Sequence, residues 1–327
     1  MRVVEGLPGA ATVTRAGSVE LELAGGPADV GSGARCTPQT PFQIASVSKQ
    51  FAAAAIMLLA ESGTVELGEP VARWLPGSPP QWRRVTLHHL LTHTAGVRHW
   101  GDAPGFQPSQ PMDPGERLAL IQRAPLLTEP GTQWRYSSPG YLLVGLIVER
   151  ASGQPYPDFL AARILSPLGL ASTTAGAAPT DPAMARGHRN GQPVPSWDLS
   201  AMAGTGDICS TVGDLARYTT ALHSGELLTA DSLRLMCTPH APAGGGRSGG
   251  GQSGGDGWLA SDGYGYGHYI GTIGGRAAYF HSGDNPGYLS FAGWIPGDEV
   301  SAVILANDEA ADLEDLLKQL LAAAQET

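Results

Sequence analysis

Residues 41–63 read PFQIASVSKQFAAAAIMLLAESG, and this stretch predicts the central helix of the fold. Between Ser46 and Glu61 it holds no proline or glycine, and Gly63 stands where a helix C-terminus favours glycine. Apolar residues dominate the segment instead of following a single stripe. We therefore predict a helix over residues 46–61 that is buried on nearly all sides.

Segments typical of strands lie at both ends of the chain. Residues 12–26 alternate in polarity and are interrupted by glycine, which predicts a β-hairpin. Four β-rich runs near the C-terminus are YGYGHYIGTIGG, RAAYFHSG, GYLSFAGWIPG and EVSAVILAND. Residues 309–325 carry leucines at helical spacing. This order predicts an α/β (α+β) fold, in which an antiparallel sheet built from both ends is flanked by helices and carries an inserted, mostly helical subdomain.

The expected division of the chain follows the same pattern. Residues 1–65 and 258–327 form the sheet subdomain, and residues 66–240 form the helical one. Helices are predicted within 85–96, 111–124, 137–153 and 210–225, the third with Ser138 as N-cap, whereas residues 171–209 show little periodicity. Residues 241–257 read APAGGGRSGGGQSGGDG and predict a flexible surface loop.

Composition and charge exclude several classes of function. The chain has 327 residues, a net charge of −10 and 15% charged residues, so nucleic acid and anionic lipid are not expected partners. No apolar run is long enough to span a membrane and no secretory signal is visible, so a cytoplasmic location is expected. The three distant cysteines predict free thiols, and neither a metal nor a cofactor is predicted.

Ser46 and Lys49 form a Ser-x-x-Lys pair at the start of the predicted central helix. Residues three apart on a helix face the same way, with Cβ atoms about 5–6 Å apart. Only two of the 20 basic residues are lysines, and burial can lower a lysine pKa by up to about 3–5 units, whereas arginine stays charged. A neutral amine can accept the serine proton. For this pair alone, the alternative is an N-cap serine beside a solvated lysine.

Two other segments fit the same chemistry. Tyr136 precedes the helix predicted within 137–153, where a phenol can share a proton with the Ser–Lys pair. Phe280-His281-Ser282-Gly283 ends a predicted strand, and glycine there lets a substrate backbone approach closely. The alternatives are a half-buried tyrosine and a partly buried strand histidine.

Taken in order, the motifs ASVSKQF, LLTHTAG, YSSPGY and GYGHYIG with HSGDNPGY resemble those of the penicillin-recognising serine hydrolases. That superfamily includes class C β-lactamases, serine DD-carboxypeptidases, D-aminopeptidases and esterases, and the resemblance covers nearly the whole chain. It implies Ser46 as the acylated nucleophile, Lys49 as its activating partner and Tyr136 as the proton shuttle to the leaving group. It leaves open whether Lys49 or Tyr136 is the general base. The substrate-binding residues that it implies are Ser138, His281, Ser282, Gly283 and Asp284, the last through a backbone N–H that completes an oxyanion hole with that of Ser46.

Departures from the family pattern bear on the substrate. Ser138 stands where an asparagine is usual, and His281 replaces the lysine that would bind a substrate carboxylate. Asp284 adds a negative charge nearby. These differences predict hydrolysis of an ester or amide in a small molecule or short peptide, with weak or absent β-lactam turnover. Arg276 would restore the positive charge if its side chain reached the cleft.

Two alternative functions remain at this point. The same acyl-enzyme can pass its acyl group to an amine or alcohol, as in acyltransferases and peptide cyclases. A non-catalytic, ligand-binding descendant is the other alternative, although it predicts decay of motifs that here retain Ser46, Lys49 and Tyr136.

Overall fold

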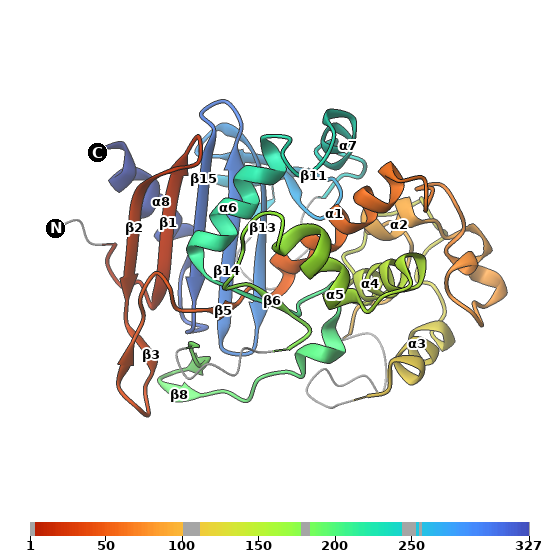
Figure 1. Cartoon of the computed structure of the whole chain (residues 1–327), viewed down its shortest axis with the longest axis horizontal. Coiled ribbons are helices and arrows are strands. Elements are labelled where there is room, and N and C mark those ends of the chain that lie inside the picture. Colours follow the sequence, from red (N-terminus) through yellow and green to blue (C-terminus); the bar gives the residue numbers. More distant parts are fainter. Residues whose placement is uncertain (1–3, 101–111, 178–183, 244–252, 255–256, 327) are drawn as a thin grey trace.

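An eight-stranded sheet forms one half of the molecule, and strands from both ends of the chain meet in it (Figure 1). The computed structural model describes residues 4–100, 112–177, 184–243, 253–254 and 257–326. The strand order is β10-β11-β12-β13-β14-β15-β1-β2, antiparallel except between β10 and β11. The predicted α/β fold with a sheet from both termini is confirmed. The strands are β1 Gly9–Arg15, β2 Ser18–Gly25, β10 Ser253–Gly254, β11 Leu259–Tyr264, β12 Tyr269–Ile273, β13 Arg276–Asn285, β14 Tyr288–Ile295 and β15 Val300–Ala306.

Helices cover both faces of this sheet. Alternate strand residues point to opposite faces, and the strands carry buried apolar residues on each face. On β1, Ala10 belongs to the larger hydrophobic core, which includes residues of α6 (Val212–His223). Its neighbour Ala11 belongs to a second core with α8 (Leu313–Gln325). Figure 1 shows α6 in front of the sheet and α8 behind it.

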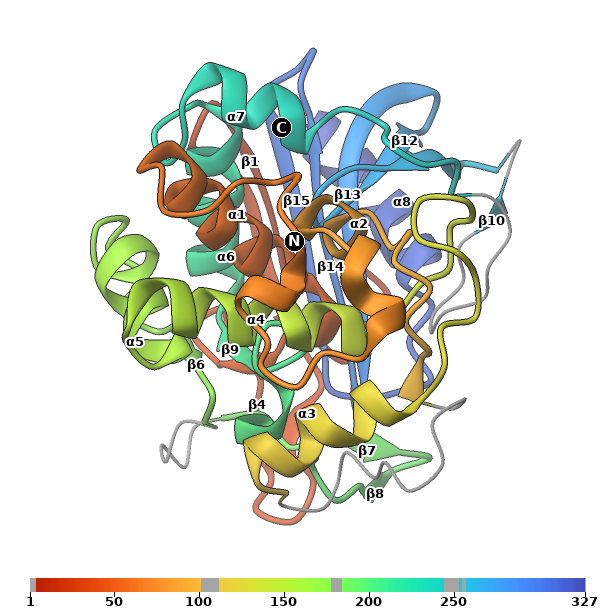
Figure 2. The same ribbon diagram turned by 90° about the vertical axis from the view of Figure 1, so that its right-hand side faces the viewer.

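The other half of the molecule is mostly helical and packs around α1 (Ser48–Glu61), whose residues 48–59 are all buried. Figure 2 shows α2, α3, α4 and α5 gathered on this side. The remaining helices are α2 Leu87–Leu91, α3 Pro114–Arg123, α4 Ser138–Ser152, α5 Tyr156–Leu160 and α7 Ala230–Met236. The short strands are β3 Pro27–Asp29, β4 Ala34–Arg35, β5 Phe42–Gln43, β6 Thr174–Ala175, β7 His188–Arg189, β8 Gln192–Pro193 and β9 Ile208–Ser210.

Several predicted boundaries differ from the structure. The helix expected from Ser46 begins with a 3₁₀ turn at Ala45–Val47. The N-cap of α4 is Ser137, whose Oγ accepts a hydrogen bond from the Gly140 N–H, and not Ser138. The run 264–275 is split between β11 and β12, because residues 265–268 form the connection between them.

The predicted loop at 241–257 lies mainly outside the described residues. Those that are described there, Ser253–Gly254, pair with β11 as the short parallel strand β10, which the sequence did not indicate.

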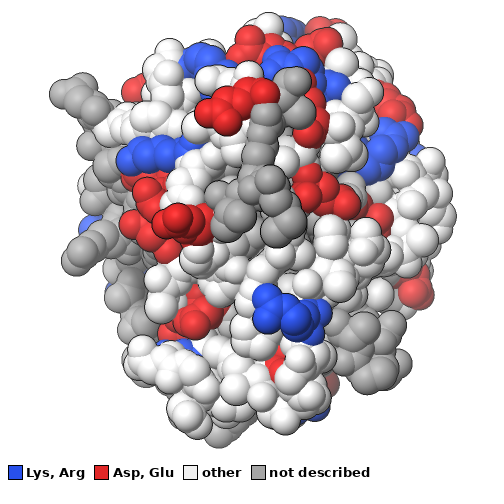
Figure 3. Space-filling model, turned by 90° about the vertical axis from the view of Figure 1, so that its left-hand side faces the viewer, with Lys and Arg blue, Asp and Glu red and all other residues white. Residues whose placement is uncertain are grey.

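The described surface carries charges of both signs. On the face that holds β2 and α8, acidic and basic side chains are interspersed, and the described residues form no continuous basic patch there (Figure 3). No described helix has the length and apolar character needed to cross a membrane.

Candidate active site

Ser46 lies on a tight 3₁₀ turn between β5 and α1. It is partly accessible, whereas the rest of residues 41–50 are buried. Ala45 has φ +46°, a left-handed conformation that costs a non-glycine residue about 1–3 kcal/mol. Two hydrogen bonds hold the turn: the Ile44 N–H donates to the Ile208 carbonyl at 2.9 Å, and Ser290 Oγ donates to the Ile44 carbonyl at 2.7 Å. The fold thereby presents one hydroxyl from an otherwise buried segment.

Lys49 reaches Ser46 from one turn further along the chain. Its Nζ lies 2.9 Å from Ser46 Oγ and 3.3 Å from Ser138 Oγ. It also donates to the Thr205 carbonyl at 2.9 Å and to Thr205 Oγ1 at 3.1 Å. The side chain is fully buried, and this burial holds the Lys49 pKa well below its usual value, although the buried Asp207 carboxyl opposes the shift. The structure thus places an amine that deprotonates readily against the serine hydroxyl.

Tyr136 approaches Ser46 from the loop before α4, and its OH donates to Ser46 Oγ at 2.9 Å. Burial raises the pKa of this phenol, so it keeps its proton at neutral pH. His93, from the LLTHTAG motif, holds the loop: its carbonyl accepts from the Arg135 N–H at 2.8 Å, and its Nδ1 accepts from the Ser137 N–H at 3.1 Å. The motif therefore positions the loop that carries Tyr136 beside Ser46.

The end of β13 forms the opposite wall of the site. β12 pairs with β13 only as far as Phe280, so residues 281–285 have no described strand partner on that edge. A Cβ on Gly283 would collide with the Ile44 carbonyl oxygen and Ser290 Oγ, so glycine allows the strand to lie against the Ser46 turn. Ser282 and Asp284 both line the cleft.

His281 is fully enclosed and is not the partly buried histidine considered from the sequence. Its Nδ1–H donates to the Ser282 carbonyl at 2.5 Å, which leaves Nε2 to accept from the Tyr264 hydroxyl at 3.1 Å. Burial lowers the pKa of His281 to about 3, so the ring is neutral at physiological pH. The third motif supplies no positive charge to the cleft.

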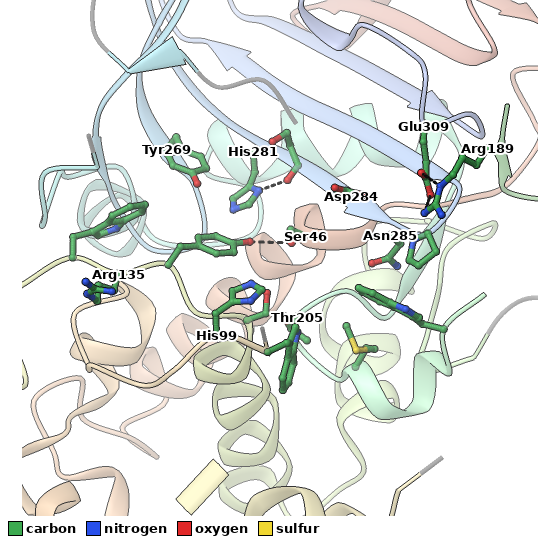
Figure 4. Close-up of a pocket in the computed structure, with 18 of the residues that line it drawn as sticks. Ser46, His99, Arg135, Arg189, Thr205, Tyr269, His281, Asp284, Asn285 and Glu309 are labelled. Atoms are coloured by element: carbon green, nitrogen blue, oxygen red, sulfur yellow. Dashed lines mark hydrogen bonds and ion pairs between the residues drawn. The ribbon is translucent and has the colours of Figure 1, made fainter. Parts of the chain in front are cut away.

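These residues border a cavity of about 820 Å³ (Figure 4). Arg276 does not reach it, because this side chain pairs with Asp298 at the far end of β13. The cations that line the cavity are Arg135 and Arg189, which the sequence did not single out. The full lining is Ser46, His99, Trp100, Gln133, Trp134, Arg135, Tyr136, Ser138, Arg189, Trp197, Met202, Thr205, Tyr269, His281, Ser282, Asp284, Asn285, Pro286 and Glu309.

Thr205 and Asp207 are the residues near Ser46 and Lys49 that the sequence did not single out. They lie in the stretch of little periodicity, 171–209, and the Gly204 N–H donates to Asp207 Oδ1 at 3.0 Å, which closes the turn that carries Thr205. The local signal in the sequence is an aspartate among glycines, which by itself indicates a turn.

Comparisons with known proteins find similar sequences and similar structures. Esterase EstB of Burkholderia gladioli is 37% identical over 180 residues, which are 49% of this chain and 45% of that protein. Penicillin-binding protein 4 of Amycolatopsis lactamdurans is 29% identical over 352 residues, covering 98% of this chain and 87% of that protein. The D-amino acid amidase of Ochrobactrum anthropi SV3 superposes with a TM-score of 0.80 at 25% identity, over 97% of this chain and 92% of that one. The family model described as Beta-lactamase matches residues 2–326, and the chain belongs to this family.

Proposed function

We propose that the protein is a serine hydrolase that forms a covalent acyl-enzyme on Ser46 from an ester or amide substrate. The observation that carries this proposal is the position of Ser46 Oγ, 2.9 Å from Lys49 Nζ and 2.9 Å from Tyr136 OH. The similarity to an esterase and to a D-amino acid amidase supports the same class of reaction.

The opposite pKa shifts of the two neighbours divide their roles. Lys49 is easily deprotonated, so its neutral Nζ takes the proton as Ser46 Oγ attacks the substrate carbonyl. Tyr136 keeps its proton, so it can protonate the leaving alcohol or amine and recover that proton from Lys49. The backbone N–H groups of Ser46 and Asp284 would stabilise the oxyanion. Water then attacks the acyl-enzyme, releases the acid and restores the Ser46 hydroxyl.

The charges beside Ser46 differ from those expected of a site that binds the carboxylate of a β-lactam. His281 is neutral, and the Asp284 carboxylate lies on the same strand edge. Ser138 contacts Lys49 through its short hydroxyl, where the family's asparagine would offer an amide to the substrate. We therefore expect penicillins to acylate Ser46 more slowly than they would if a lysine stood at position 281.

Acid-quenched intact mass spectrometry during turnover of p-nitrophenyl butyrate tests the proposal. The wild type is expected to gain the mass of one butyryl group, and Ser46→Ala none. Ser62→Ala is the matched control, because Ser62 is an exposed serine at the far end of α1. An adduct that persists in the Ser46→Ala variant, or a wild type that hydrolyses no ester or amide, would overturn the proposal. A parallel incubation with fluorescent penicillin is expected to label the protein more slowly than a fluorophosphonate does.

A further inference from the structure

Two oppositely charged side chains lie on opposite sides of Ser46 in the cleft. Figure 4 shows Arg135 on one side of the serine and Asp284 on the other. Both residues are exposed and both line the cavity. Neither has an ion pair or a side-chain hydrogen bond with any other residue that the structure describes, so both charges are available to a ligand.

The corner around Asp284 carries an excess of negative charge. Arg189 is the nearby cation, but Glu309 already binds it through two contacts of 2.5 and 2.9 Å. Glu309 also accepts from the Gly287 N–H at 2.7 Å, which fixes this ion pair in place. One carboxylate, that of Asp284, is left over. Loss of solvent around Asp284 within the cleft and the neighbouring Glu309 carboxylate both raise the Asp284 pKa, whereas Arg189 opposes the shift. A substrate cation at this corner would relieve that repulsion.

The position of Tyr136 indicates which half of the substrate meets each charge. Tyr136 is the proposed proton donor to the leaving group, so the leaving half lies over its hydroxyl. Arg135 precedes Tyr136 in the same loop and therefore borders the leaving half. Asp284 lies on the free edge of β13, on the other side of Ser46, and therefore borders the acyl half.

We infer that the cleft selects substrates that carry an ammonium group in the acyl half, read by Asp284, and a carboxylate in the leaving half, read by Arg135. A short peptide with a free amino end and a free carboxyl end matches this polarity, as do amino-acid amides in their acyl half. The inference rests on the proposed function, because it assigns the two sides from the direction of acyl transfer.

The acyl half is tested by competition against hydrolysis of a neutral ester, 4-acetoxybenzamide. The inhibitors are alaninamide, as each enantiomer, and propanamide, which has nearly the same shape without the ammonium group. In the wild type, the inhibition constant of alaninamide is expected to be about fivefold lower than that of propanamide, which is the upper range for an accessible ion pair. This preference is expected to fall to about onefold in Asp284→Asn and to persist in Asp298→Asn. The second variant loses a carboxylate at the other end of β13, outside the cleft.

The leaving half is tested with 4-acetoxybenzoate against 4-acetoxybenzamide. The ratio of their kcat/KM values is expected to be about fivefold higher in the wild type than in Arg135→Gln. Arg163→Gln, at an exposed arginine outside the cleft, is the matched control and should keep the wild-type ratio. Raising the salt to 1 M is expected to weaken both preferences without any mutation, since exposed charges are then screened within about 3 Å.

The outcomes separate the inference from the function on which it rests. The inference would be overturned if the substrate and inhibitor preferences were the same in Asp284→Asn and Arg135→Gln as in the wild type, or if 1 M salt left the wild-type preferences unchanged. Hydrolysis of the neutral ester would still support the proposed function in that case. Absence of hydrolysis of the neutral 4-acetoxybenzamide and of any other ester would instead overturn the proposed function.

Discussion

Replacing Lys49 by arginine tests whether Lys49 acts as a base or only as a positive charge that positions its neighbours. Lys49 Nζ contacts oxygen atoms of Ser46, Ser138 and Thr205 in a fully buried position. Arginine can make similar contacts and keeps a positive charge, but it cannot give up its proton at any accessible pH. If Lys49 works as a neutral amine, Lys49→Arg must lose that chemistry even where the fold tolerates it.

The size of the effect follows from the burial of the amine. A lysine with the ordinary pKa of about 10.4 would be neutral in roughly one molecule in 2,500 at pH 7, an unfavourable term of about 4.6 kcal/mol. Burial reduces this term by lowering the Lys49 pKa. Since general-base catalysis contributes typically about 10²–10⁴-fold, we expect Lys49→Arg to lower kcat/KM by that factor.

The assay is hydrolysis of p-nitrophenyl butyrate at pH 7 by the wild type, Lys49→Arg and Lys49→Met. Lys49→Met has similar length without a base and sets the baseline, and circular dichroism with thermal melting checks the fold of each variant. Lys49→Arg is expected within about tenfold of Lys49→Met, since both lack the base. A folded Lys49→Arg enzyme that kept more than about a tenth of wild-type activity would refute the role of Lys49 as base.

Three further predictions concern the neighbours of this pair. Tyr136→Phe is expected to slow an ethyl ester more than a p-nitrophenyl ester, because p-nitrophenolate leaves without a proton; equal losses in kcat/KM would contradict its role as acid. Gly283→Ala is expected to lower the free energy of unfolding by about 1–3 kcal/mol, because the added Cβ would overlap the Ile44 carbonyl. Urea melts measure this change, and Gly68→Ala serves as the control because nothing lies within 4 Å of a Cβ at that position. The pKa of His281 is about 3 in the folded protein and about 6.5 in the unfolded chain. Between these two pH values only the unfolded chain binds the proton, so the contribution of His281 to stability falls as the pH falls from 6.5 towards 3. From pH 7 to pH 5 the wild type should lose about 2 kcal/mol more than His281→Asn in urea melts, and equal losses would refute this.

Local geometry explains what the sequence could predict. The spacing of Ser46 and Lys49 brings them together through helical geometry alone, and the structure shows Nζ 2.9 Å from Oγ. The strands at the two ends of the chain could be joined in one sheet because their alternation required a common core. Neither inference needed a long-range contact to be known in advance.

Long-range packing decides the rest. Ser137 and Ser138 both satisfy the N-cap preference before a proline, and only the structure shows that Ser137 caps α4 while Ser138 turns to Lys49. Thr205 arrives at Lys49 through a turn in an aperiodic segment, which carries no signal of its destination. The sequence leaves open whether Arg276 reaches the cleft, and strand direction places it at the far end of β13, beside Asp298.

The protonation state of Lys49 can be measured directly because the chain contains only two lysines, Lys49 and Lys318. Protein labelled with ¹³Cε-lysine should therefore show two side-chain resonances, and Lys318→Arg assigns them. Lys318 is bound to Glu314, which raises its pKa. We predict that the Lys49 resonance titrates well below the ordinary value of about 10.4, while that of Lys318 titrates above it. A Lys49 resonance that titrated at or above about 10.4 in the folded protein would contradict the claim that a neutral amine activates Ser46.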